Sequence, residues 1–175
     1  MSIPHLNITH AFDFYKRFIL DYSQDKSVVY QKYGFTLQGS IGFKDWEVFV
    51  AILLNDKAKS GDGADLEKHE VKSANLGSSY EYQYHKNHGL QKLNGDKHID
   101  HVFIGRSEDY SNIEVWWVSG SSLAPKFDSW EPDLKKNYKE GIKQRFRRSI
   151  THSFVAKNGH LLVEIKNGKL IVPED

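Results

Sequence analysis

The stretch Ser60-Gly61-Asp62-Gly63-Ala64-Asp65-Leu66-Glu67-Lys68-His69-Glu70-Val71-Lys72-Ser73 places acidic residues in a glycine-flanked turn directly before a predicted strand. Successive side chains of a strand point to opposite faces, so Glu70 and Lys72 should project together while Val71 enters the core. If the turn brings Asp62 beside them, two carboxylates can hold a hard divalent cation such as Mg²⁺, which prefers oxygen ligands and keeps several waters. The stretch therefore predicts a metal site with Asp62 and Glu70 as ligands and Lys72 beside a bound water.

An acid two residues before a lysine occurs at three places, so the surrounding sequence has to distinguish them. Asp133-Leu134-Lys135 follows Pro132 at a predicted helix start, where residues two apart do not share a face. Glu164-Ile165-Lys166 lies in a predicted C-terminal hairpin without an acidic turn before it. Only Glu70 follows such a turn, in which two glycines allow backbone conformations closed to other residues. Asp65 is the alternative first acid, and a solvated charged turn before an edge strand is the alternative to a site.

Length and composition predict one globular domain inside the cell. The chain has 175 residues, of which 39% are hydrophobic and 13% aromatic, enough to bury a sizeable core. It has no cysteine, which excludes disulfides and cysteine-ligated zinc and fits a reducing compartment. No apolar run approaches the ~18 residues of a membrane span, and the first residues lack a signal-peptide pattern. We therefore expect a cytoplasmic protein without a membrane partner.

Periodicity predicts an α/β fold with a mixed central β-sheet flanked by helices and a small C-terminal β-hairpin sheet. Asn-Gly pairs at 158–159 and 167–168 predict tight hairpins. The expected helices are an aromatic-faced N-terminal one from Ala11 to Tyr22, one from Trp46 to Leu54, and one that opens at Pro132 and carries Leu134, Tyr138, Ile142 and Phe146; besides the Glu70 strand, strands are expected at 99–105 and 112–119. Within one domain, residues 1–40 would be a helical dimerisation part, 41–120 the catalytic core and 121–175 a DNA-recognition part.

The order of these parts resembles the PD-(D/E)XK nuclease superfamily, and within it the small type II restriction endonucleases of the PvuII kind. The resemblance covers roughly residues 40 to 165 as an order of parts more than as identity. It rests on the acidic turn and Glu70-Val71-Lys72-Ser73-Ala74-Asn75, on the apolar helix 45–55 before them, on the segment Tyr82-Gln83-Tyr84-His85-Lys86-Asn87-His88 after them, and on the later runs Asp128-Ser129-Trp130-Glu131 and Ile150-Thr151-His152-Ser153. The chain departs from the pattern in having no proline before Asp62 and a compact turn between Asp62 and Glu70.

This resemblance implies a restriction-endonuclease-like core that hydrolyses double-stranded DNA with Mg²⁺, with Asp62, Glu70 and Lys72 as catalytic residues. Cutting both strands of a short palindrome would call for a homodimer, since protein symmetry most simply matches DNA symmetry. A restriction enzyme would also be paired with a DNA methyltransferase. The alternative is a non-catalytic module that binds nucleic acid or carbohydrate and stacks aromatic rings on bases or sugars. Its candidate rings are Tyr80, Tyr82, Tyr84, Trp116 and Trp117.

DNA contacts are predicted from two polar segments, although the formal net charge of +1 is low for a DNA-binding protein. Acids gather between Asp56 and Glu70, whereas basic residues gather before Ser149. Glutamine and asparagine can pair with adenine, and lysine or protonated histidine can donate to guanine. The predicted DNA-binding residues are Gln83, Tyr84, His85, Lys86 and Asn87 in the first segment, Thr151 and His152 in the second, and Arg147 and Arg148, which would contact phosphates. An exposed polar loop and a solvated helix face are the alternative interpretations.

Overall fold

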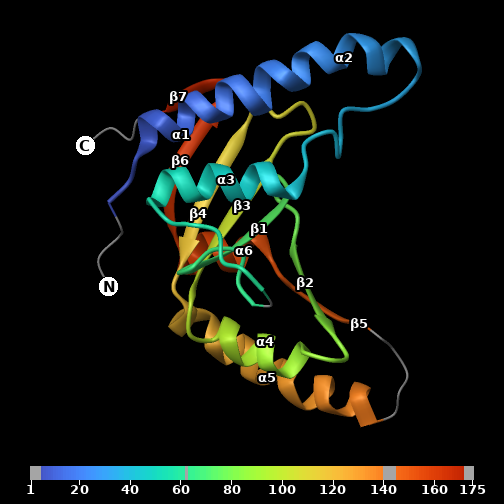
Figure 1. Cartoon of the computed structure of the whole chain (residues 1–175), viewed down its shortest axis with the longest axis vertical. Helices are drawn as coiled ribbons and strands as arrows, with labels where there is room; N and C mark the ends of the chain where they lie inside the picture. The colour runs from blue at the N-terminus through green and yellow to red at the C-terminus, as the bar shows by residue number, and fades with distance from the viewer. Residues whose placement is uncertain (1–4, 62, 140–144, 172–175) are drawn as a thin grey trace.

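A computed structural model describes residues 5–61, 63–139 and 145–171 of the chain. It contains a five-stranded mixed sheet, a separate two-stranded antiparallel sheet and helices around them, which confirms the predicted fold class. The elements in chain order are α1 (Ile8–Phe14), η1 (Tyr15–Asp21), α2 (Tyr22–Lys32), α3 (Phe43–Leu54), β1 (His69–Asn75), β2 (Tyr80–His85), α4 (Gly89–Asp96), β3 (Asp100–Arg106), β4 (Ile113–Val118), α5 (Gly120–Lys139), β5 (Arg145–Ile150), α6 (His152–Asn158), β6 (His160–Lys166) and β7 (Lys169–Ile171) (Figure 1).

The five-stranded sheet runs in the order β1-β3-β4-β6-β7, so the strand that carries Glu70 lies at one edge. Strand β1 pairs in parallel with β3, which places Glu70 opposite His101, and the remaining pairs of this sheet are antiparallel. Parallel neighbours need a crossover connection, and here β2 and α4 form it. The crossover brings α4 to the same region of the molecule as Glu70.

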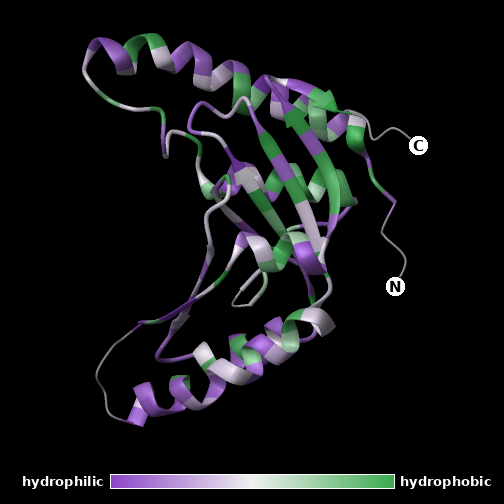
Figure 2. Cartoon of the chain, turned by 180° about the vertical axis from the view of Figure 1, so that it is seen from behind, coloured by the Kyte–Doolittle hydropathy of each residue, from purple (hydrophilic) through white to green (hydrophobic). Residues whose placement is uncertain are grey.

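Two hydrophobic cores lie on the two faces of this sheet. On one face, α1, η1 and α3 pack against the strands, with Tyr15, Ile19, Trp46 and Phe49 almost fully buried. On the other face, the two-stranded sheet of β2 and β5 packs with α4, α5 and α6. Figure 2 shows hydrophobic stretches along the strands of the five-stranded sheet and mainly hydrophilic residues on α5. In the described part of the chain, no helix combines the length and apolar character that a membrane span needs.

The predicted third helix is wrong in its bounds. Helix α5 begins at Gly120, and the Oγ of Ser119 accepts a hydrogen bond from the backbone N of Ser122 at 3.2 Å, so a serine cap starts the helix well before Pro132. Phe146 belongs to β5 instead, and Ile142 lies outside the described residues. The predicted strands at 99–105 and 112–119 are confirmed as β3 and β4.

One of the two predicted hairpins is confirmed and the other is wrong. Asn167 and Gly168 have positive φ angles of 51° and 71° and join β6 to β7 in a tight turn. Asn158 instead ends helix α6, and Gly159 leads directly into β6. The short helix forms because Thr151 caps it: its Oγ1 accepts from the backbone N of Phe154 at 3.2 Å.

Candidate active site

Glu70 and Lys72 share one face of β1, as the strand period predicts. The Nζ of Lys72 lies 2.5 Å from the Oε1 of Glu70, whereas Val71 packs into the core on the other face. The Lys72 ammonium also lies 5.1 Å from the centre of the Tyr82 ring, which fixes it from the side of β2. The strand thus holds a carboxylate and an ammonium as a preformed pair.

The carboxylate of Glu70 is the most unusual group of the site, because it is ionisable and only 1% exposed. Its Oε1 accepts from two ammonium groups, those of Lys72 and of Lys92, the second at 2.9 Å. Burial alone would raise the pKa of Glu70, but the two cations outweigh burial and lower the pKa below its ordinary value. Its Oε2 is buried and has no hydrogen-bond partner among the described residues. A buried charged oxygen without a partner is costly, so this atom is a candidate ligand atom.

Asp65 is the acid of the turn that the structure places beside Glu70. Its Oδ2 accepts from the backbone N of Val71 at 3.0 Å, which ties the turn to β1. Burial, followed by the negative charge of Glu70, raises the pKa of Asp65. Asp62, the predicted first ligand, lies outside the described residues. Among the described acids of the turn, Asp65 is therefore the neighbour of Glu70.

Helix α4 contributes two charged residues that the sequence did not single out. Lys92 contacts Glu70 and, at 3.0 Å, the Oδ1 of Asp96 one turn further along. The hydroxyl of Tyr84 donates to the Oδ2 of Asp96 at 3.0 Å, and burial raises the pKa of Asp96 to about 6. The spacing of four residues between Lys92 and Asp96 is that of an ion pair on one helix face. No local sequence pattern, however, links Lys92 to Glu70, which lies more than twenty positions earlier in the chain.

A cavity of about 620 Å³ opens beside this network. It is lined by Gly61 and Gly63 from the acidic turn, by Gln83 and His85 from β2 and by Lys92 from α4, among others. The structure thus brings the predicted catalytic turn and part of the predicted base-contacting segment to one hollow. Such a concave surface with convergent polar groups is the usual form of a binding site.

The first predicted DNA-binding segment divides into exposed and buried residues. His85, Lys86 and Asn87 are exposed and Gln83 is half-buried, so these side chains remain available on the surface. The prediction that Tyr84 binds DNA is wrong: its side chain is fully buried and its hydroxyl donates to Asp96, so it cannot contact a base. Every second side chain of β2 points inward, because side chains alternate along a strand. The prediction that the whole polar run is exposed did not take this alternation into account.

The two predicted phosphate contacts lie on opposite faces of β5. Arg147 is exposed directly across from Gln83, with its Nη1 3.7 Å from the Oε2 of Glu81. Arg148 turns inward, where its Nη2 lies 2.7 Å from the Oδ2 of Asp133 and its guanidinium lies 4.2 Å from the centre of the Phe146 ring. Arg147 therefore belongs to the outer surface of the two-stranded sheet, whereas Arg148 lies on the side of Phe146 and is partly exposed in its pair with Asp133.

The second predicted polar turn is engaged in contacts of its own. Thr151 caps α6, and the Nε2 of His152 lies 3.1 Å from the Oε2 of Glu114. Neither residue lines the cavity beside Glu70. The structure therefore does not bring Thr151 and His152 together with Gln83 and His85.

The carboxylates of Asp65 and Glu70 fit a hard cation better than a soft one, because they offer only oxygen atoms. In residues 5–61, 63–139 and 145–171, no group of three or more histidine, aspartate or glutamate side chains could by itself hold a metal ion. Mg²⁺ does not need such a group, since proteins bind it through one or two carboxylates, waters and the phosphates of the substrate. The Oε2 of Glu70, which has no hydrogen-bond partner in the described part of the chain, is consistent with this mode of binding.

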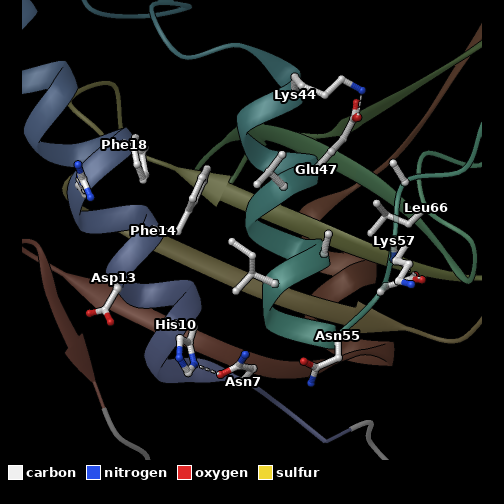
Figure 3. A pocket seen from close by; sticks show the side chains of 16 residues that line it. Asn7, His10, Asp13, Phe14, Phe18, Lys44, Glu47, Asn55, Lys57 and Leu66 are labelled. Carbon is white, nitrogen blue, oxygen red and sulfur yellow. Dashed lines mark hydrogen bonds and ion pairs between the residues drawn. The ribbon is translucent and has the colours of Figure 1, made fainter.

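A second hollow, a groove of about 850 Å³, lies between α3 and the N-terminal helical segment, which consists of α1, η1 and α2 (residues 8–32). Figure 3 shows Phe14 and Phe18 pointing from that segment toward α3, while His10 is hydrogen-bonded to Asn7 at one end. The ion pair of Lys44 with Glu47 lies at the other end. Its lining is mainly apolar, but Asp56 also lines it and forms a nearly buried pair with His69, whose Nδ1 lies 2.7 Å from the Oδ2 of Asp56.

No protein-family model matches the chain, and no curated protein sequence matches it.

Proposed function

We propose that this protein is a Mg²⁺-dependent endodeoxyribonuclease that cleaves double-stranded DNA at a short palindromic sequence, as type II restriction endonucleases do. The observation that carries the proposal is the buried carboxylate of Glu70 near Asp65: Lys72 binds one of its oxygens, and the other has no hydrogen-bond partner among the described residues. The site adjoins a cavity lined by polar groups of β2, where a nucleic acid could be contacted. The order of the sequence elements supports the same assignment.

In this proposal Glu70 and an acid of the turn, Asp65 or Asp62, hold the cation. A bound Mg²⁺ would polarise the scissile phosphate and lower the pKa of a bound water. Lys72 donates hydrogen bonds to the attacking water and stabilises the negative charge that develops on the phosphate. Its side chain is 19% exposed, and its ammonium is held against Glu70 and the Tyr82 ring, so it is oriented before substrate arrives.

The two-stranded sheet would supply the DNA contacts. A two-stranded β-ribbon fits the major groove, and Gln83, His85 and Arg147 all lie on the outer face of β2 and β5. Lys86 and Asn87 follow on the exposed loop. Contacts from these residues to base edges would specify the sequence, while contacts to phosphates would fix the position.

Cleavage of both strands in one binding event would require a homodimer. The segment of η1 and α2 supports this, because Phe18 and Tyr22 are 47% and 51% exposed, whereas Tyr15, Ile19 and Leu20 of η1 are buried. We further propose that the enzyme acts in the cytoplasm. There a DNA methyltransferase would have to modify the same sequence, since unprotected host DNA would be cut.

The alternative of a binding module that stacks rings on bases or sugars has less support. Tyr80, Tyr82 and Tyr84 are fully buried and Trp117 is only 4% exposed. Trp116 is half-buried, and its indole nitrogen donates to Glu114. These rings belong to the core, so they do not form an exposed platform.

The first prediction tests the chemistry with plasmid DNA and Mg²⁺. We expect wild-type protein to give discrete fragments, and Glu70→Gln or Lys72→Met to lower the cleavage rate by at least about 100-fold, because each removes a group that acts on the reacting atoms. The sequence offers a matched control: Glu164 and Lys166 form the same acid-x-lysine pair on β6, with a distance of 2.7 Å and no acidic turn nearby. Glu164→Gln and Lys166→Met should cleave like wild type.

The second prediction concerns the acid of the turn. If Asp65 is the second ligand, Asp65→Asn should abolish cleavage while Asp62→Asn keeps the wild-type rate. The reverse pattern would assign the role to Asp62. Wild-type rates in Asp62→Asn, Asp65→Asn and Glu70→Gln alike, with intact folding by circular dichroism, would refute a nuclease site at this position.

A further inference from the structure

We propose that Lys92 is a positioning residue of this site: by holding the Oε1 of Glu70, it keeps the Oε2 as the single ligand atom that Glu70 offers to a cation. This inference rests on the proposed nuclease function and deepens it, because it assigns a role to a second lysine on a different element. It begins from the contacts of the carboxylate. One oxygen of Glu70 accepts from two ammonium groups and the other accepts from none among the described residues.

Lys92 is itself held in place by a chain of contacts. Its Nζ lies 2.9 Å from Glu70 and 3.0 Å from the Oδ1 of Asp96, one helical turn away on α4. The other oxygen of Asp96 accepts from the hydroxyl of Tyr84 at 3.0 Å, and that tyrosine is fully buried. The orientation of Lys92 is therefore set from β2 through Asp96, independently of Glu70.

The second ammonium on the Oε1 of Glu70 restricts how this carboxylate can present its oxygens to a cation. With Lys72 alone, the Glu70 carboxylate could turn about its last bond and present both oxygens to a cation. With Lys92 as well, rotation would break two charged hydrogen bonds, which are stronger than neutral ones. Residues behind a metal ligand orient it in this way in other sites, and their removal costs about 10- to 100-fold in activity or metal affinity.

Because Lys92 is positively charged, its removal should affect the cleavage rate and the affinity for a cation in different directions. The Lys92 ammonium lies within hydrogen-bond distance of a metal ligand, so its positive charge opposes binding of a cation. Removing it should therefore leave cation affinity equal or tighter. Removing it should nevertheless slow cleavage, because Glu70 loses its fixed orientation.

The experiment compares wild type with Lys92→Met, which keeps the length of the side chain and removes the charge. Cleavage of plasmid DNA is measured over a range of Mg²⁺ concentrations, which gives kcat and the half-saturating concentration separately. Calcium binding to the free protein is measured by calorimetry, which reports on the cation site without cleavage. We expect kcat at saturating Mg²⁺ to fall by about 10- to 100-fold. The half-saturating Mg²⁺ concentration and the dissociation constant for Ca²⁺ should not rise.

Lys97→Met is the matched control, because Lys97 follows directly after α4 and pairs with Asp128 and Glu131 at 2.8 and 2.7 Å, away from Glu70. It should keep the wild-type kcat. If Lys92→Met does not fold by circular dichroism, Asp96→Asn replaces it. That variant keeps Lys92 but weakens its anchor, and should lower kcat without weakening Ca²⁺ binding.

Two results would overturn the role of Lys92 while leaving the nuclease assignment intact. One is a wild-type kcat in folded Lys92→Met. The other is a parallel loss of kcat and Ca²⁺ affinity, which would mean that Lys92 only supports the local structure. A wild-type protein that neither cleaves DNA with Mg²⁺ nor binds Ca²⁺ would instead refute the proposed function, and the role of Lys92 with it.

Discussion

Individual residues at the site show what a strand period reveals and what it omits. The alternation around Val71 was enough to place Glu70 and Lys72 on one face, and the structure confirms this. Alternation does not say which face is covered. Here Glu70 lies on the side of Tyr82 and His101 and is only 1% exposed, which the alternative of a solvated turn did not anticipate. Lys92 was missed because its contact with Glu70 depends on the crossover between parallel strands, and no local pattern encodes that.

His101 illustrates how this core constrains ionisation. Its Nε2 lies 2.8 Å from the backbone O of Asp96, which can only accept, so the Nε2 carries the hydrogen. The Nδ1 of the neutral ring then accepts from the hydroxyl of Tyr82 at 2.8 Å. Protonation would remove that acceptor and place a charge in a fully buried position. Burial accordingly lowers the pKa of His101 to about 4.

The third prediction concerns the pH dependence of stability that follows from His101. The pKa of the histidine is lower in the folded chain than its ordinary value of 6.5, so as pH falls from 6.5 toward 4 the unfolded chain takes up a proton that the folded chain refuses. The free energy of unfolding should therefore fall over this range, by up to about 3 kcal/mol from His101. Urea unfolding of wild type and His101→Gln at several pH values measures it. The stability difference between the two proteins should shrink toward pH 4, and a constant difference would contradict the assignment.

At the scale of elements, the sequence predicted strands better than the junctions between strands and helices. Strands β1, β3 and β4 and the turn at Asn167-Gly168 follow from alternation and turn chemistry. Asn158-Gly159 has the same sequence as the hairpin turn at Asn167-Gly168, but here the glycine is required by close packing rather than by a turn. A Cβ at Gly159 would lie 2.8 Å from the backbone O of Val155 and 2.9 Å from that of Trp117. Close packing of α6 against β4 requires this glycine, and a dipeptide pattern cannot show that.

The fourth prediction follows from this close approach. Gly159→Ala should destabilise the protein by about 1–3 kcal/mol, because the added methyl group meets backbone atoms that cannot move aside easily. Gly95→Ala is a suitable control, since a Cβ there meets no atom within 4 Å. Thermal unfolding of the two variants measures the difference. Equal melting temperatures would mean that α6 can shift relative to β4.

The fifth prediction separates two neighbouring arginines of β5 that sequence alone treated alike. Arg147→Ala should weaken DNA binding and reduce the salt dependence by about 0.9 in log–log slope, as loss of one phosphate contact does. Arg148→Ala should leave that slope unchanged and lower stability by up to about 1 kcal/mol, because its ion pair with Asp133 is partly exposed. Binding is measured with Ca²⁺ in place of Mg²⁺ at several salt concentrations. A change of slope in Arg148→Ala alone would show that the outward face of β5 does not meet DNA.

The whole molecule separates the proposed working parts in space. The N-terminal helical segment lies at one end, α4 and α5 lie at the other, and the strands join them (Figure 1). Glu70 lies on the edge strand next to α4, so one end of the protein would carry the chemistry and the ribbon of β2 and β5 would carry the DNA contacts. A net charge of +1 is compatible with this arrangement, because Glu70 and Asp96 are paired with Lys72 and Lys92 while Arg147 stays on the outer surface.

The end of the molecule farthest from α5 gives the last prediction, which concerns assembly. Phe18 is 47% exposed, and Tyr22, four residues further on, is 51% exposed; aromatic side chains are enriched at protein interfaces. Phe18→Asp should raise the dissociation constant of the homodimer at least tenfold, which is about 1.4 kcal/mol. It should also convert double-strand cleavage into single-strand nicking at low protein concentration. Leu161→Asp is the control, with a side chain 42% exposed on β6 outside this segment. Sedimentation of free and DNA-bound protein measures the assembly, and a wild-type protein that is monomeric in both states would exclude a homodimer.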